Sequence, residues 1–122
     1  MRVTLRVTPE GQCYSLGLRE SQRGLMREVL LFLKDRPDGD IASMVRVGVD
    51  RGSLGRLGEK LDSRDVCLSL EEVHIISSAL TFTIVMIQSE REFFTRIGFF
   101  KEQAVSLVNV LARDIASAVD SR

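Results

Sequence analysis

The chain has 122 residues, the usual size of one compact domain, with 44% hydrophobic and 28% charged residues, a balance typical of a globular rather than a disordered protein. Lysine plus arginine total 17, and so do aspartate plus glutamate, so the sequence lacks the basic excess of most nucleic-acid-binding proteins. We expect a single domain over residues 1–122.

The N-terminal segment is typical of a β-hairpin. Apolar and polar residues alternate over residues 2–8, which predicts a half-buried strand. The turn signals Pro9 and Gly11 follow, and residues 13–18 can return as a second strand. The sequence therefore predicts a hairpin over residues 2–18.

Helical periodicity dominates the region that follows. Apolar residues recur every three or four positions over residues 20–35, and Pro37 stops the predicted helix. Ser53 is expected to cap a second, short helix, and residues 66–68 are expected to form a brief extended segment. The short helix would carry Leu54, Leu57 and Leu61.

Residues 41–49 fit two interpretations. Alternating valines favour a strand at 44–49. The spacing of Ile41, Met44 and Val45 fits a helical turn instead. We expect the strand.

Two capping boxes predict helix starts in the C-terminal half. In each, a serine (Ser69 or Ser89) precedes a glutamate by three residues, so that the two side chains can satisfy each other's backbone amides. The first box predicts a helix over residues 70–88. The second predicts a short helix that ends at Gly98, and a last amphipathic helix is expected over about 100–119.

Together these elements predict an α+β fold. The N-terminal β-hairpin, which the 44–49 segment can extend to three strands, packs on about four helices, with the 70–88 helix at the centre. That helix is apolar on two faces, so its second face also makes a homodimer an expected arrangement. The second face carries Ile75, Ala79, Phe82 and Met86. The most apolar stretch is shorter than a membrane span, so no membrane contact is expected.

Catalytic and metal-binding residues are sparse. Cys13 and Cys67 lie among apolar residues without a Cys-x-x-Cys motif, so we expect two buried free thiols. The single histidine, His74, has no ligand cluster around it. The N-terminal residues contain no long apolar segment, so we expect no signal peptide. The sequence thus predicts a non-enzymatic cytoplasmic protein with no cofactor and no metal.

A glycine-rich segment offers an anion-binding alternative. Glycines at 52, 55 and 58 precede or open a predicted helix, and helix N-termini can bind anions. The lysine-serine ending of a Walker motif is absent, so we expect a flexible connector. The alternative is a nucleic-acid or anion-binding regulatory protein that uses Arg46, Arg51, Arg56 and Lys60.

An aromatic segment at 93–100 holds four of the six phenylalanines. Consecutive helical residues point about 100° apart, so these rings cannot all enter the core from one side. The first interpretation is that they plug the junction between helices. The second is a partner-binding patch, because aromatic residues and arginine dominate interface hot spots. Its residues are Phe93, Phe94, Arg96, Phe99 and Phe100.

Residues 68–111 resemble a segment of small, mostly uncharacterised bacterial proteins. The residues that carry the resemblance are the runs Leu68 to His74 and Ser89 to Phe99, with Ala79-Leu80 between them. Some of those proteins are similar to immunity proteins, which bind and neutralise a toxin protein. The resemblance implies a non-enzymatic module that binds a partner protein.

Overall fold

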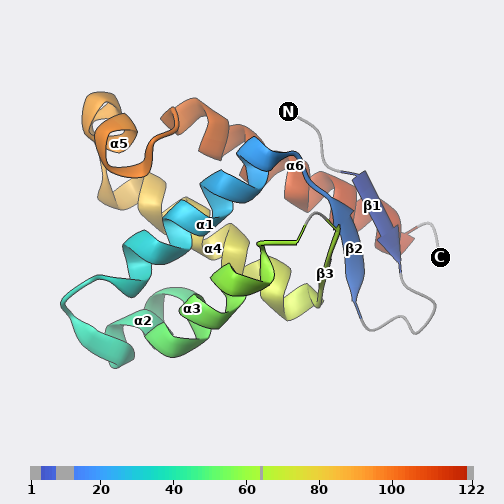
Figure 1. The fold of residues 1–122 in the computed structure, drawn as a ribbon, viewed down its shortest axis with the longest axis horizontal. Coiled ribbons are helices and arrows are strands. Elements are labelled where there is room, and N and C mark those ends of the chain that lie inside the picture. Colours follow the sequence, from blue (N-terminus) through green and yellow to red (C-terminus); the bar gives the residue numbers. More distant parts are fainter. Residues whose placement is uncertain (1–3, 8–12, 64, 121–122) are drawn as a thin grey trace.

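The computed structural model describes residues 4–7, 13–63 and 65–120 (Figure 1). The fold is α+β and mostly helical, with six helices and three strands among the described residues. In chain order the elements are β1 (Thr4–Val7), β2 (Tyr14–Gly17), α1 (Glu20–Lys34), α2 (Gly39–Val47), α3 (Arg51–Lys60), β3 (Asp65–Leu68), α4 (Leu70–Met86), α5 (Glu90–Ile97) and α6 (Lys101–Asp120). The expectation of about four helices was too low, because residues 41–47 are helical as well.

The strands form one antiparallel sheet in the order β1-β2-β3. β1 pairs with β2, which confirms the predicted hairpin within the described part of residues 2–18. β2 pairs with β3, with Tyr14 opposite Leu68 and Leu16 opposite Val66. These four side chains are buried, and they anchor one face of the sheet in the core. The extended segment expected at 66–68 is thus a strand.

The prediction of a strand at 44–49 is wrong, because these residues form the end of helix α2 and the turn after it. Gly48 has φ +85° and its amide donates to the Met44 carbonyl at 2.9 Å, which is a left-handed helix ending that glycine adopts without strain. The Ser43 hydroxyl donates to the Val49 carbonyl at 2.7 Å. Local capping therefore outweighs the strand preference of the alternating valines.

The capping residues in the second half of the chain largely follow the sequence. Ser69 and Glu72 form a complete capping box: the Glu72 amide donates to Ser69 Oγ at 3.0 Å, and the Ser69 amide donates to Glu72 Oε1 at 2.9 Å. Ser89 accepts from the amide three residues later at 3.2 Å. Gly98 ends α5 with φ +85°. The predicted cap of α3 was wrong, since Asp50 is the capping residue and its side chain accepts a hydrogen bond from the Ser53 amide.

Helix α4 is central, because it packs against α1, α2, α6 and β3. Both of its apolar faces are buried in its first half, where Ile75, Ile76 and Ala79 contribute to the core. In its second half Phe82, Val85 and Met86 are exposed, so the predicted second face is only partly covered. Within the described residues, no helix combines the length and apolarity that crossing a membrane requires.

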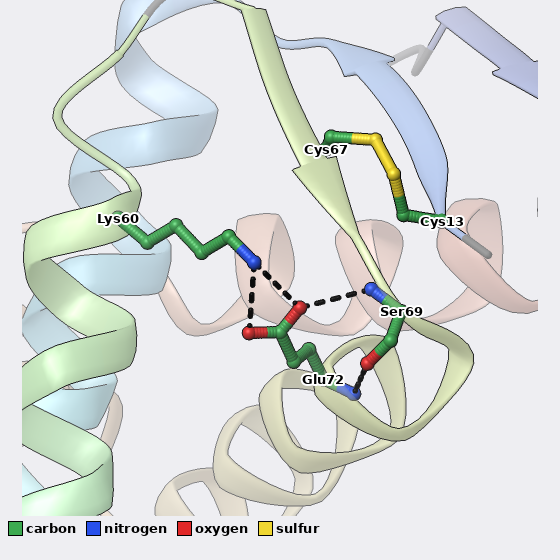
Figure 2. The surroundings of a disulfide bond; sticks show 5 residues. All are labelled: Cys13, Lys60, Cys67, Ser69 and Glu72. Atoms are coloured by element: carbon green, nitrogen blue, oxygen red, sulfur yellow. Dashed lines mark hydrogen bonds and ion pairs between the residues drawn. A yellow bond between two sulfur atoms is a disulfide. The ribbon is translucent and has the colours of Figure 1, made fainter. Parts of the chain in front are cut away.

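A disulfide bond joins Cys13 to Cys67, so the prediction of two free thiols was wrong (Figure 2). The register that buries Tyr14 and Leu68 turns the cysteines to the opposite, outward face of the sheet, since side chains alternate along a strand. Their Cα atoms lie 5.6 Å apart, within the range that a disulfide spans. The apolar neighbours that suggested burial, Tyr14, Val66 and Leu68, belong to the other face.

Candidate functional site

The aromatic segment 93–100 forms α5 and the turn into α6. Phe93 is fully buried and Ile97 lies beside it in the core, as their spacing of four residues requires. Phe94 and Phe100, in contrast, are 46% and 62% exposed. Their rings stack on each other, with centroids 4.8 Å apart and an angle of 29° between the planes. This stack, which we call the Phe94–Phe100 pair, therefore lies on the surface.

Arg96 lies on the other edge of α5 and faces α1. Its guanidinium carbon is 5.2 Å from the centroid of the Phe32 ring, and that of Arg36 is 5.1 Å from the same centroid. Cations at this distance are attracted by the aromatic ring. Arg96 also has a long contact with Glu92, at 3.4 Å. We call Phe32, Arg36 and Arg96 the arginine–phenylalanine cluster.

Arg36 carries an unsatisfied polar group. Among the described residues it forms no ion pair, and its Nε is buried without a hydrogen-bond partner. A buried, unpaired N–H of a charged group is costly.

A hollow of about 410 Å³ adjoins the cluster where α1 ends. It is lined by Glu28, Leu31, Phe32, Asp35, Arg36 and Arg96. The two carboxylates balance the two arginines, so the hollow combines both charges with the apolar Leu31 and Phe32. A partner with both polar and apolar groups fits this lining better than a simple anion.

Phe99 packs against α1 at Gly24, nearer to the N-terminal end of that helix. It lines a second hollow with Gly24 and Glu28, and Glu28 also belongs to the first hollow. A Cβ at Gly24 would lie only 3.1 Å from the Phe99 ring, so the glycine allows the ring to approach the helix closely. Phe99 is half-buried as a result.

The structure therefore separates the five residues predicted as one patch. Phe93 belongs to the core, Phe94 and Phe100 form one exposed pair, and Arg96 and Phe99 contact α1. Sequence reasoning missed Phe32 and Arg36, because both lie far from Arg96 in the chain. The single local signal was the exposed side of α1, where a phenylalanine stands among charged residues.

The alternative anion-binding residues are largely occupied by neighbouring acceptors. Arg46 pairs with Asp38, Arg51 pairs with Asp40 at 3.0 Å, and Lys60 pairs with Glu72 at 2.8 Å. Arg56 donates to the Ser53 hydroxyl at 2.9 Å. The hydrogen bonds from the Arg51 amide and side chain lower the pKa of the Asp40 carboxyl, which stays charged and keeps its partner. Three of the four basic groups are thus paired with carboxylates, whereas the exposed Arg56 contacts only a hydroxyl.

The residues considered for catalysis are not brought together. Cys13 and Cys67 are bonded to each other, so neither is a thiol nucleophile for His74, which is exposed on α4. In the described part of the chain, no three histidine, cysteine, aspartate or glutamate residues converge on a point that could hold a metal ion.

The α5 end of the molecule combines two surface features that suit contact with a protein. The Phe94–Phe100 pair offers an apolar surface on one edge of α5, and the arginine–phenylalanine cluster offers charge and an aromatic ring on the other. No protein-family model, curated protein or solved structure matches the chain. The chemistry of this end is apolar contact plus hydrogen bonding from two arginines.

Proposed function

We propose that the chain is a non-enzymatic protein-binding module of the kind that bacterial immunity proteins represent. Its partner would cover α5 and contact both edges of that helix. The observation that carries the proposal is the Phe94–Phe100 pair, whose rings stack on each other while remaining 46% and 62% exposed. Rings at a protein's surface gain stability when a partner removes them from water.

The position of α5 supports this proposal. Figure 1 shows α5 at one end of the molecule, remote from the sheet. A partner can therefore approach it without contact with the hairpin. The arginine–phenylalanine cluster lies on the α1 side of the same helix, and arginine and aromatic residues contribute strongly to binding energy at interfaces.

Affinity measurements with a surface double variant test the proposal. The tagged chain captures its partner from the source organism, and the purified partner is then titrated against wild type and against Phe94→Ser combined with Phe100→Ser. Because both rings are exposed, the variant should remain folded. We expect its affinity to fall by about 30-fold or more, as for a central interface residue.

A matched control shows whether the loss of affinity is specific to the α5 surface. Val119→Ser also removes an exposed apolar side chain, but it lies near the far end of α6 and should leave the affinity unchanged. Equal affinity of wild type and the double variant, with identical circular dichroism, would contradict the proposal. A partner that is a toxin encoded beside this chain would support the immunity type specifically.

A further inference from the structure

Two adjoining hollows lie along the outer side of α1. One, of about 410 Å³, is at the C-terminal end of the helix, the other, of about 570 Å³, is nearer its N-terminal end, and Glu28 lines both. On α1 the lining residues recur every three or four positions from Glu20 to Arg36, so they form one stripe of the helix. Arg96 and Phe99 line the hollows from the other side. We call the two hollows together the α1 groove.

Apolar side chains lie at two points along the α1 groove. Leu31 is 46% exposed, and Phe32 beside it is half-buried. The half-buried Phe99 ring packs on α1 at Gly24, which lies two turns before Leu31. An occupant would therefore bury apolar surface at two points about 10 Å apart along α1.

The N-terminal end of the α1 groove is negatively charged. Glu20 and Glu28 are exposed there, and neither side chain forms an ion pair within the described part of the chain. The third charged group that lines this hollow, Arg27, is paired with Asp62. Its charge is thus compensated inside the molecule, whereas the charges of the two glutamates are not.

The C-terminal end of the α1 groove is positively charged. Beyond Glu28, which both hollows share, the charged residues here are Asp35, Arg36 and Arg96. The two arginines outnumber the one aspartate, and the ion pair of Arg96 with Glu92 is long, at 3.4 Å. The charge of the groove therefore changes from negative to positive along the direction of α1.

The dimensions of the α1 groove fit a helix. Its lining spans 16 steps along α1, or about 24 Å, which is the length of a helix of about 16 residues. The backbone groups of α1 are bonded within that helix, so they give no partners to the bare N–H and C=O groups of an extended peptide. A helix satisfies its own backbone groups and packs through rows of side chains.

We propose that the α1 groove binds one amphipathic helix of the partner protein, antiparallel to α1. Helices favour acidic residues in the first turn and basic residues in the last. An antiparallel helix therefore brings its basic end to Glu20 and its acidic end to Arg36 and Arg96, and the two helix dipoles oppose each other. Its apolar side covers Leu31 and Phe99. The inference rests on the proposed function and names the element through which the partner binds.

A synthetic helical peptide tests the binding. It has about 16 residues, a stripe of leucines, glutamates in its first turn and lysines beside the stripe in its C-terminal half. A hydrocarbon staple keeps it helical, because an isolated helix of this length is marginal in water. In an NMR titration of the full chain at low ionic strength, it should shift the backbone resonances of residues 20–36 and 96–99. A second peptide, with glutamine in place of every charged residue, should bind about 10-fold more weakly.

A nitroxide at the C-terminal end of the charged peptide tests the orientation. An antiparallel peptide broadens the resonances around Glu20, whereas a parallel peptide broadens those around Arg36. Glu28→Lys should weaken the binding of the charged peptide about 5-fold or more. The matched variant Glu59→Lys changes an exposed glutamate of α3 that lies outside the groove, and it should leave the affinity unchanged.

Four results would each overturn the proposal. They are no binding up to about 1 mM peptide, equal binding of the uncharged peptide, shifts confined to other helices, and broadening around Arg36. If the peptide fails in this way but Phe94→Ser with Phe100→Ser still weakens binding of the partner, the proposed function stands and the helix is refuted. If the peptide binds as expected but the double variant does not affect the partner, the proposed function fails instead.

Discussion

Breaking the bond between Cys13 and Cys67 should destabilise the chain strongly without unfolding it. The two cysteines lie 54 residues apart in sequence, and the segment between them contains α1, α2 and α3. Both side chains are half-buried on the outward face of the sheet, whereas the core face is filled by other residues. Removal of the bond therefore leaves no core cavity. The loss of stability comes mainly from the greater conformational entropy of the unfolded chain without the bond.

The magnitude follows from the size of the closed loop. The entropy lost by the unfolded chain on closing a loop of this length corresponds to about 4 kcal/mol at 25 °C. A domain of this size typically has about 5–15 kcal/mol of stability, so the reduced chain should still fold. The melting temperature should fall by roughly 10–20 °C, since 1 kcal/mol corresponds to a few degrees at this length.

Urea denaturation followed by circular dichroism measures the difference. The samples are oxidised wild type, wild type in dithiothreitol, and the double variant Cys13→Ser with Cys67→Ser. We expect reduced wild type and the double variant to agree, and both to fall about 4 kcal/mol below oxidised wild type. Dithiothreitol should not affect the double variant. A difference below about 1 kcal/mol between oxidised and reduced wild type would refute this reasoning.

Three further predictions concern helix ends. Ser69→Ala should lower the free energy of unfolding by about 1 kcal/mol, because the cap of α4 is lost. Burial alone would raise the pKa of Glu72, but hydrogen bonds from Lys60 and from the Ser69 amide outweigh it, so the pKa is lowered. The charged Glu72 side chain should therefore stabilise the fold fully above about pH 5, and this stabilisation should disappear as the pH falls through the folded-state pKa. Urea titrations at several pH values test this. Glu72→Gln should be less stable than wild type near neutrality and nearly as stable as wild type in strong acid. Gly98→Ala, at φ +85°, should cost about 1 kcal/mol, whereas Gly58→Ala, inside α3 with open space around it, should gain about 0.5–1 kcal/mol. Equal effects of the two alanine variants in thermal unfolding would contradict the conformational argument.

Local signals predicted the element boundaries that depend only on residues close together in the sequence. Ser69 starts α4 and Gly98 ends α5, because a cap and a left-handed residue act over a few neighbouring positions. Ser89 shows the limit of this reasoning. Glu92, three residues after Ser89, turns instead toward Arg96, one turn further along the helix. This contact takes the place of the hydrogen bond from the Ser89 amide to Glu92 that would complete the capping box.

Two errors share one physical cause, which is that burial depends on the whole fold. The valines at 45, 47 and 49 alternate as in a strand, yet Val45 is exposed and Val47 buried on a helix. The cysteines have apolar neighbours, yet those neighbours occupy the other face of the sheet. The pairing of Cys13 with Cys67 depends on the register of β2 and β3, which no window of local sequence contains.

The aromatic segment shows both what helical geometry can predict and where it stops. The 100° step between residues required that Phe93 and Phe94 point apart, and the structure has one ring in the core and the other on the surface. The step could not identify the group that Arg96 would contact, because Phe32 approaches from α1. The single patch expected from sequence is thus two surfaces on opposite edges of α5, and a partner large enough to cover the helix would contact both.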